Sequence, residues 1–259
     1  MRILVSNDDG IDAPGLRTLV KVLAKEHEVY VVAPSGERSS YSHSVTYWRL
    51  DNKAWEREVE GAVKAWAVDA TPADCVYYGI ETLLEEKPDL VVSGINKGEN
   101  LSSDCIYSGT VGAAMEGMMM GVPAIAVSYC SYTDTAFETS AEVALRLIPY
   151  FMQEDNRNAF VLNVNVPALD LEDIKGVRAT RLDGYKVYHK TIERIPCEDG
   201  SFILHCPNQP GLSAGLSDRL DADITAVRNG YVSVTPLYAD MADHRQLGMM
   251  EKWNRIILL

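Results

Sequence analysis

The most chemically distinctive feature of this 259-residue sequence is a pair of adjacent carboxylates close to its amino terminus. Asp8 and Asp9 follow the short apolar run 3–5, and Gly10 comes next. Neighbouring carboxylates repel one another unless a cation neutralises them. Ligands that are all oxygen favour a hard divalent ion, Mg²⁺ or Mn²⁺, over Zn²⁺. A solvated acidic turn is the alternative, because Asp and Gly are ordinary turn residues.

The residues around the pair predict the fold that would position it. The run 3–5 is typical of a buried strand, and Pro14 suits the first turn of a helix with a regularly spaced apolar face. A second apolar run, 29–33, completes a strand–helix–strand unit of a parallel sheet. Ligands of open α/β sheets bind outside the carboxyl ends of the strands. We therefore expect Asp8 and Asp9 at that edge.

Two further polar segments follow predicted strands and should reach the same edge. The first, 34–44, is rich in hydroxyl groups and contains Ser39 and Arg38, which has the chemistry of a phosphate clamp. A flexible serine-rich loop is its alternative. The second, 94–100, follows the buried strand 89–93 and contains Asn96 and Lys97. For Lys97, a solvated surface lysine is the alternative.

A third segment has the composition of a phosphate-binding helix start. Ser108, Gly109 and Thr110 open a predicted helix with small residues, where free backbone N–H groups and the helix dipole can hold an anion. The hydroxyls of Ser108 and Thr110 add donors. An N-capped helix that packs closely through small residues would give the same pattern.

The rest of the pattern predicts a Rossmann-like α/β core, 1–167, with a mainly parallel sheet and helices on both faces. A hairpin-rich region with a C-terminal helix, 168–259, follows it within a single domain and serves oligomerisation by packing on another subunit. Further core strands are expected over 45–50, 63–68, 122–128 and 160–166, and helices beginning at Thr71 and over 136–152. Beyond residue 170 we expect hairpin segments over 177–182, 186–195 and 201–205, helices over 221–229 and 243–255, and a strand over 231–237.

Composition narrows the partners and the compartment. The net charge of −13 disfavours binding to a nucleic-acid polymer or to an anionic membrane. The five cysteines have no C-x-x-C spacing, so reduced thiols are expected rather than a disulfide framework or a zinc site. The apolar run at the amino terminus is too short for a signal peptide, and no run reaches membrane-spanning length. We expect a cytoplasmic protein.

Three motifs, together and in this order, resemble the survival protein SurE family: Asn7-Asp8-Asp9-Gly10-Ile11, Ser93-Gly94-Ile95-Asn96-x-Gly98-x-Asn100 and Tyr107-Ser108-Gly109-Thr110-Val111-Gly112-Ala113-Ala114. Three more extend the resemblance over nearly the whole chain: Thr71-Pro72-Ala73-Asp74-Cys75-Val76, Asn163-Val164-Asn165-Val166-Pro167 and Gly230-Tyr231-x-Ser233-Val234-Thr235-Pro236-Leu237. The sequence departs from the family pattern at Ser40, where a glycine usually follows the ligand serine.

The resemblance implies a metal-dependent phosphatase that acts on nucleoside 5′- and 3′-monophosphates; the sequence leaves open short polyphosphate as a further substrate. It implies a Rossmann-like core and dimers or tetramers that exchange C-terminal segments. One divalent ion per subunit, Mg²⁺ or Mn²⁺, would be held by Asp8, Asp9, Ser39 and Asn96. We assign catalysis to Asp8, Asp9 and Asn96, and substrate binding to Asn96, Ser108, Gly109 and Thr110.

Two other functions fit part of this pattern. A haloacid-dehalogenase-type phosphatase also places Asp residues after a first strand and uses one as a covalent nucleophile, although that class needs Asp-x-Asp rather than an adjacent pair. A non-catalytic nucleotide-binding module could hold phosphate at a helix start without hydrolysing it. The clustered carboxylates count against such a module.

Overall fold

The computed structural model describes residues 1–49, 51–133, 135–187, 192–205, 212–214, 217–251 and 253. Its centre is a mixed sheet, built within these residues from nine strands. Their bounds are β1 Arg2–Ser6, β2 Glu28–Pro34, β3 Ala54–Arg57, β4 Ala62–Val68, β5 Leu90–Lys97, β6 Ala124–Cys130, β7 Val161–Pro167, β8 Val177–Ala179 and β13 Val232–Leu237.

The strand order is β3-β4-β2-β1-β5-β6-β7-β13-β8. All pairings from β4 across to β7 are parallel, whereas β3 is antiparallel to β4 and β13 is antiparallel to β7. The carboxyl ends of β1, β2, β5 and β6 therefore meet at one edge of the sheet. The predicted mainly parallel sheet is confirmed.

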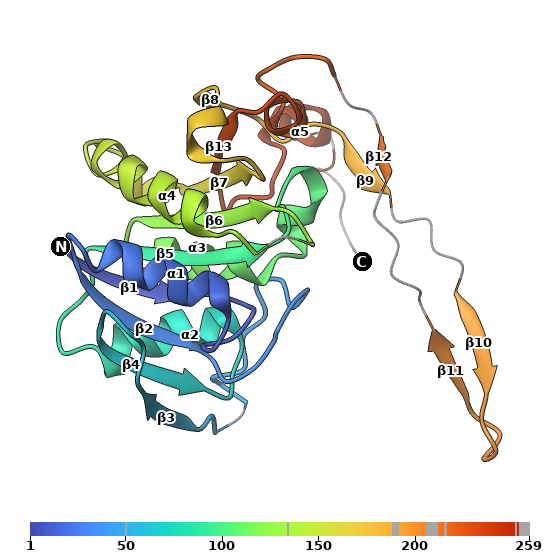
Figure 1. Ribbon diagram of the computed structural model, residues 1–259. Coiled ribbons are helices and arrows are strands. Elements are labelled where there is room, and N and C mark those ends of the chain that lie inside the picture. Colours follow the sequence, from blue (N-terminus) through green and yellow to red (C-terminus); the bar gives the residue numbers. More distant parts are fainter. Residues whose placement is uncertain are drawn as a thin grey trace.

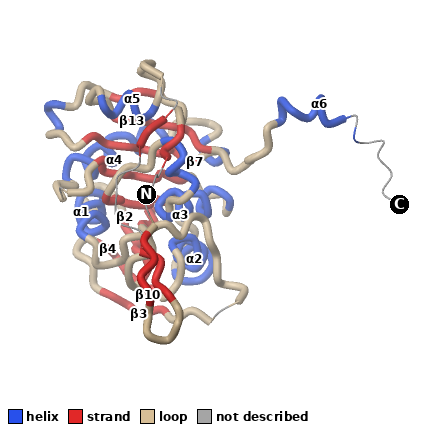
Figure 2. The backbone as a smooth tube through the Cα atoms, turned by 90° about the vertical axis from the view of Figure 1, so that its right-hand side faces the viewer, coloured by secondary structure: helices blue, strands red, loops and turns tan. Residues whose placement is uncertain are grey.

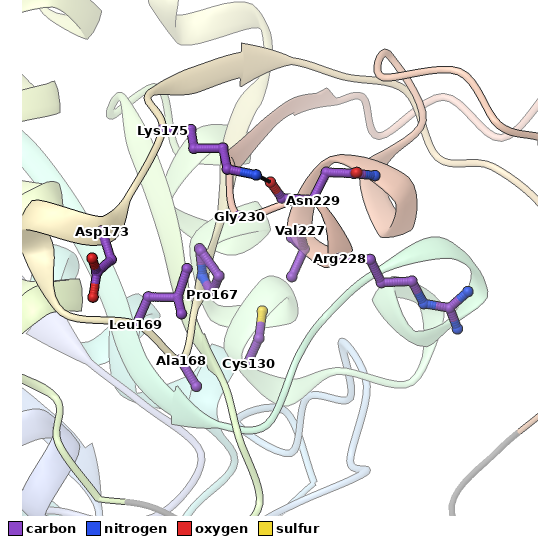
Figure 3. Close-up of a pocket in the computed structure, with 10 residues that line it drawn as sticks. All are labelled: Cys130, Pro167, Ala168, Leu169, Asp173, Lys175, Val227, Arg228, Asn229 and Gly230. Atoms are coloured by element: carbon purple, nitrogen blue, oxygen red, sulfur yellow. Dashed lines mark hydrogen bonds between the residues drawn. The ribbon is translucent and has the colours of Figure 1, made fainter.

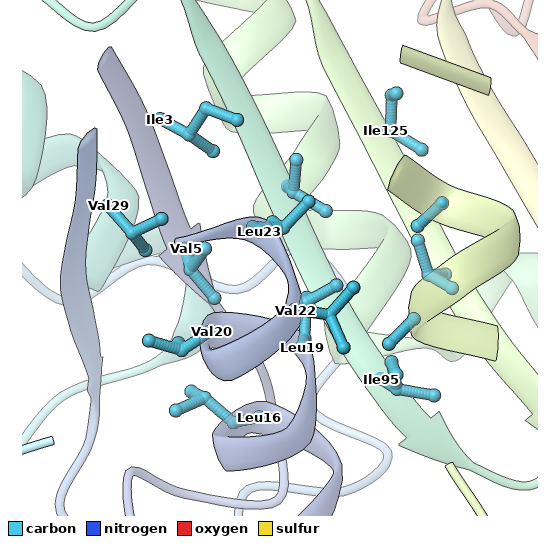
Figure 4. Close-up of a cluster of buried hydrophobic side chains, with 14 of the residues drawn as sticks. Ile3, Val5, Leu16, Leu19, Val20, Val22, Leu23, Val29, Ile95 and Ile125 are labelled. Carbon is cyan, nitrogen blue, oxygen red and sulfur yellow. The ribbon is translucent and has the colours of Figure 1, made fainter. Parts of the chain in front are cut away.

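Helices cover both faces of this sheet, as predicted (Figure 1). On one face lie α1, Pro14–Leu23, and α4, Glu138–Phe151; on the other lie α2, Pro72–Tyr78, and α3, Gly109–Met119. Successive strand residues point to opposite faces, so Ile3 and Val5 pack under α1 (Figure 4) while Leu4 joins the cluster under α2 and α3. Burial on both faces explains why the central strands are continuous apolar runs.

The helix starts follow the signals expected from the sequence. The Thr71 hydroxyl accepts from the backbone N–H of Asp74, and the Asp74 carboxylate accepts from the backbone N–H of Thr71. Ser108 caps α3 in the same way by accepting from the N–H of Val111 at 3.1 Å. The remaining helical elements are η1 Gly79–Leu83, η2 Ser102–Ile106, η3 Arg157–Ala159, η4 Leu171–Asp173, α5 Asp223–Arg228, η5 His244–Gln246 and α6 Leu247–Met250.

Two expectations for the core are wrong. The strand predicted over 45–50 is absent from residues 45–49, because the backbone N–H of Thr46 donates to the Asp74 carboxylate at 2.8 Å and so cannot pair with another strand. Residue 50 lies outside the described residues. The strand that precedes β4 is instead β3. The loop expected from Gly94 is also displaced, since β5 continues through Asn96 to Lys97 with an irregular register against β6.

The C-terminal half contributes to the sheet and also extends from it. The hairpin expected over 177–182 is wrong, because β8 pairs in parallel with β13 inside the main sheet. Beyond it, β9, Tyr185–Val187, pairs with β12, Leu212–Ala214, and β10, Glu193–Pro196, forms a hairpin with β11, Phe202–His205, which projects from the body (Figure 1). Part of the predicted segment 186–195, at 188–191, lies outside the described residues.

The last elements are partly as expected. The predicted helix over 221–229 and strand over 231–237 are present as α5 and β13. The predicted helix over 243–255 is shorter, since its described part consists of η5 and α6, which lie away from the sheet (Figure 2); residues 252 and 254–255 are outside the description. Over the described residues, no helix combines the length and the hydropathy needed to span a membrane.

Close packing at Gly15 fixes α1 against the end of β5. A Cβ atom at Gly15 would lie 2.2 Å from the carbonyl oxygen of Ile95, next to the predicted ligand Asn96. We expect Gly15→Ala to lower the free energy of unfolding by about 1–3 kcal/mol, because backbone must move to accept the methyl group. Gly36→Ala is the matched control, since a Cβ there meets nothing within 4 Å. Equal denaturation midpoints for the two variants would contradict this packing.

Candidate active site

Asp8 is the buried centre of the site. Its side chain lies just beyond β1, with the residue 3 % exposed, and its Oδ1 accepts a hydrogen bond from the Thr110 hydroxyl at 2.5 Å. A Cβ at Gly109 would lie 2.9 Å from the Asp8 Oδ2, so a side chain there would push into the carboxylate. The start of α3 therefore packs directly on Asp8. The structure thus brings the predicted site residue Asp8 into contact with two others, Gly109 and Thr110, that lie about a hundred positions further along the sequence.

Asp9 lies beside Asp8 in a less enclosed position. Its Oδ2 accepts a long hydrogen bond, 3.4 Å, from the backbone N–H of Lys97 at the end of β5. Burial, and after it the negative charge of Asp8, raises the pKa of Asp9 to about 6. Burial also raises the pKa of Asp8, against the opposing effect of the Thr110 hydroxyl and of the N–H groups of Gly109 and Thr110.

The turn that carries the pair is held by Asn7. Its side-chain amide donates to the carbonyl of Gly10 at 2.9 Å, and its Oδ1 accepts from the N–H of Gly10 at 3.2 Å. Gly10 has a φ of +99° and lies close to the backbone of Gly36, so a side chain there would meet both strain and a clash. The backbone N–H of Arg38 donates to the Asp8 carbonyl at 2.7 Å, which ties the loop after β2 to the pair.

Ser39 and Asn96 adjoin residues whose backbone contacts the pair, Arg38 and Lys97, but their own side chains are bonded elsewhere. The exposed Ser39 hydroxyl donates to Glu37 at 3.1 Å, and the Asn96 Nδ2 donates to the carbonyl of Gly98 at 2.9 Å. Since the Asn96 amide nitrogen is engaged, its Oδ1 is the atom suited to a cation. Arg38, expected as a phosphate clamp, pairs instead with the exposed carboxylate of Asp69 at 2.9 Å.

Ser108 and Thr110 differ in what they can donate. The Ser108 oxygen serves as the helix cap, which leaves its proton available to a ligand. The Thr110 hydroxyl already donates its hydrogen bond to Asp8. Sequence reasoning placed Thr110 at the phosphate and missed this contact, because a pairing across 102 positions leaves no local pattern.

The donor set fits a hard divalent cation. Asp8, Asp9, Ser39 and Asn96 would offer only oxygen atoms, which is the preference of Mg²⁺ and Mn²⁺. Within the described chain, neither carboxylate has an ion-pair partner, although both are desolvated. Among the residues that the structure describes, no three His, Cys, Asp or Glu side chains are grouped so that they could hold a metal, so a zinc-type cluster is not indicated in that part of the chain.

A separate hollow opens beyond the ends of β6 and β7, with a volume of about 510 Å³ (Figure 3). Its walls include Cys130, Leu169 and Val227, and the Lys175 ammonium at its side donates to the carbonyl of Asn229 at 2.9 Å. None of the predicted site residues lines it. The chemistry of the carboxylate pair is therefore not located in this hollow.

The fold and the site define a class: an α/β protein with a doubly wound, mainly parallel sheet and a desolvated pair of carboxylates at the carboxyl edge. Residues 3–189 match the sequence profile of the family described as Survival protein SurE. The chain belongs to this family, which confirms the resemblance seen in its motifs. Membership argues against the haloacid-dehalogenase alternative.

Individual relatives match over nearly the full length. The chain is 43 % identical to the 5'/3'-nucleotidase SurE of Salmonella paratyphi A, over 98 % of this chain and 96 % of the relative. It is 41 % identical to the 5'-nucleotidase SurE of Desulforudis audaxviator, over 98 % and 97 %. The crystal structure of the SurE protein from Aquifex aeolicus superposes with a TM-score of 0.82 at 36 % identity, covering 98 % of this chain and 100 % of that one.

The raised pKa of Asp9 predicts a pH-dependent stability for the metal-free protein. A carboxylate whose pKa rises from 3.8 to about 6 on folding binds more protons in the folded state, so its ionisation costs stability as the pH rises between those values. We expect Asp9→Asn to stabilise the metal-free protein by roughly 1–3 kcal/mol at pH 7 and by little at pH 4. Urea denaturation at both pH values in EDTA measures this.

Asp12→Asn is the control for this experiment. Asp12 is an exposed carboxylate in the same loop, paired with Arg17 and Arg57 at the surface. Such pairs contribute less than about 1 kcal/mol, so this substitution should change stability little. If Asp9→Asn lowered the free energy of unfolding at pH 7, the prediction that burial of the ionised Asp9 carboxylate destabilises the folded protein would be wrong.

Proposed function

We propose that the protein is a divalent-metal-dependent 5′/3′-nucleotidase that hydrolyses nucleoside monophosphates to nucleoside and phosphate. The observation that carries the proposal is the desolvated Asp8–Asp9 pair packed against the start of α3. The proposed cation ligands and the proposed phosphate donors would thus lie side by side, which is what phosphoryl hydrolysis requires. The curated relatives named as nucleotidases support the substrate class.

Asp8, Asp9, Asn96 and the Ser39 hydroxyl would hold one Mg²⁺ or Mn²⁺. When bound, such an ion supplies Lewis-acid polarisation of the phosphoryl group and a coordinated water of lowered pKa. Asn7 and the Gly10 turn keep the two carboxylates in place, so the ligands are arranged before the ion arrives.

The phosphate is bound by donors at the start of α3. The Ser108 hydroxyl lies at a helix amino terminus, where the dipole favours an anion, and the N–H groups of Gly109 and Thr110, which also act on the Asp8 carboxylate, would be shared with the phosphate. The Asn96 amide has a second N–H besides the one that bonds to Gly98, and this N–H would add a donor from β5. Since donors that match the developing charge act mainly in the transition state, they should affect kcat more than KM.

Asp9 is suited to orient the attacking water and accept its proton. It is more accessible than Asp8, and with a pKa of about 6 it is ionised at neutral pH but still basic enough to accept a proton. Asp8 is held by Thr110 and has little freedom to act as a nucleophile. Water then attacks phosphorus directly, and no covalent enzyme intermediate forms.

The same donors bind any terminal phosphate, so short polyphosphate is a second proposed substrate class. We also propose a cytoplasmic location. The thiols of Cys75 and Cys197 are free, which fits a reducing compartment.

Substitution of the site should remove activity without unfolding the chain. We expect Asp8→Asn to abolish phosphate release from 5′- and 3′-AMP with Mn²⁺, and EDTA to do the same to the parent. Ser108→Ala should lower kcat about tenfold to a thousandfold with a smaller change in KM. Asp12→Asn, in the same loop, should keep parent activity. Phosphate release by the parent in EDTA at the full rate would contradict the metal requirement.

Direct attack by water also fixes the stereochemistry. A single displacement inverts the configuration at phosphorus, so hydrolysis of a chiral, isotopically labelled phosphate ester should give inverted phosphate. Net retention would instead indicate two displacements through a phosphoenzyme.

We propose further that the projecting β10–β11 hairpin packs on another copy of the chain, giving dimers or tetramers. An isolated two-stranded hairpin is marginally stable in water, and this one exposes Phe202, Ile203 and Leu204, with Leu204 62 % exposed. Light scattering of the parent should give at least twice the 28.6 kDa chain mass. Ile203→Asp should shift it toward one chain, whereas Val63→Asp, at a comparably exposed valine on β4, should not. A monomeric parent would contradict this assembly.

A further inference from the structure

We propose that Asn165 and Asp223 are positioning residues for the hydrolysis, because they clamp the segment 98–107. The inference rests on the proposed function. The segment joins the end of β5, which carries Asn96, to the start of α3, which carries Ser108 to Thr110. Its conformation therefore sets the distance between the proposed metal ligand and the proposed phosphate donors.

The first clamp is a two-way contact between one side chain and one backbone unit. The Asn165 Oδ1 accepts from the backbone N–H of Asn100 at 2.8 Å, and the Asn165 Nδ2 donates to the Asn100 carbonyl at 3.1 Å. The Asn163 Nδ2 donates to the same carbonyl at 2.9 Å. Both β7 asparagines are fully buried. The carboxamide of Asn165 thus bonds to both polar groups of one buried backbone unit and accepts its N–H, while the carbonyl also accepts from Asn163.

The second clamp comes from α5. The Asp223 Oδ2 accepts from the backbone N–H of Ser102 at 2.6 Å, and its Oδ1 accepts from Ile224 at 2.8 Å and from Asp183 at 3.3 Å. Asp223 is fully buried, and Ser102 has a φ of +53°, which a serine rarely adopts. The carboxylate therefore holds the segment in a conformation that the backbone alone disfavours.

The clamped segment also supports the loop that carries Ser39. The backbone N–H of Ser42 donates to the Tyr107 carbonyl at 3.0 Å, and the Ser42 hydroxyl donates to the Ile106 carbonyl at 2.6 Å. A displacement of 98–107 would move the Ser39 loop, the end of β5 and the start of α3 together. A misplacement of about 1 Å can cost about a hundredfold in rate, so these remote contacts control the reaction.

Asp223→Asn tests the second clamp directly. In the amide, an NH₂ group replaces one of the two carboxylate oxygens. Because an NH₂ group cannot accept from a backbone N–H, the hydrogen bond from Ser102 or the one from Ile224 is lost. We expect kcat for 5′-AMP to fall about ten- to a hundredfold with KM changed less than about threefold. Mn²⁺ affinity should fall less than kcat does, since the Asp8–Asp9 pair is untouched and only the Ser39 and Asn96 ligands lie on the displaced elements. Asp221→Asn is the control, because Asp221 pairs with Arg181 and Arg219 away from the segment.

Two further variants separate positioning from general stability. Asn165→Asp keeps the acceptor for Asn100 but places an oxygen against its carbonyl, so kcat should fall as it does for Asp223→Asn. Ser102→Gly keeps the N–H that bonds to Asp223 and tolerates the positive φ but loses the hydroxyl's hydrogen bond to the Gly184 carbonyl, so kcat should fall less than it does for Asp223→Asn. If folded Asp223→Asn and Asn165→Asp both turn over at the parent rate and differ only in thermal midpoint, the positioning role is wrong.

Hydrogen exchange on the parent covers the case in which those variants do not fold. With Mn²⁺ and inorganic phosphate, amides of 98–107 and of α5 should exchange more slowly together. Protection confined to the start of α3 would overturn the clamp. Failure of the proposed function would look different, since the parent would then release no phosphate from any nucleoside monophosphate.

Discussion

The structure depends on one electrostatic constraint, the removal of two adjacent carboxylates from water at the end of β1. Asp8 is almost completely buried and Asp9 partly so, and burial raises the pKa of both. A fold gains nothing in stability from such a pair. The surrounding elements are arranged to hold it: Asn7 fixes the turn, Thr110 and the start of α3 donate to Asp8, and the N–H of Lys97 approaches Asp9. This energetic cost supports the proposed cation site.

Small residues make this arrangement possible. Gly15 lets α1 approach the carbonyl of Ile95, Gly109 lets α3 lie on Asp8, and Gly10 turns the chain between them. The apolar layers behind these contacts, Ile3 and Val5 on one face and Leu4 on the other, fix where β1 ends. The residues at the edge of the sheet are thus positioned by packing on both of its faces, and this packing predicts that the site tolerates little change in side-chain volume.

Much of this could be predicted from the sequence, because it is local. The apolar runs of β1, β2 and β5, the Pro at the start of α1 and the Ser108 cap each leave a short pattern. The strand expected over 45–50 was wrong because Asp74, on a helix, takes the backbone N–H of Thr46. Contacts such as Thr110 with Asp8, or Asp223 with Ser102, join residues more than a hundred positions apart. No periodicity in one sequence encodes such pairs, so the polar network behind the site required the fold.

If Asp8 and Asp9 bind a divalent cation, as we propose, the two carboxyl groups must lose their protons when the ion binds. Calorimetric titration of the metal-free protein with Mn²⁺, in buffers of different ionisation enthalpy, measures the protons released per ion. With the pKa of Asp9 at about 6, binding of one ion per chain should release more protons at pH 6 than at pH 8, and Asp9→Asn should reduce the release at pH 6. Binding without proton release at pH 6, or binding that survives replacement of both carboxylates by amides, would contradict the claim.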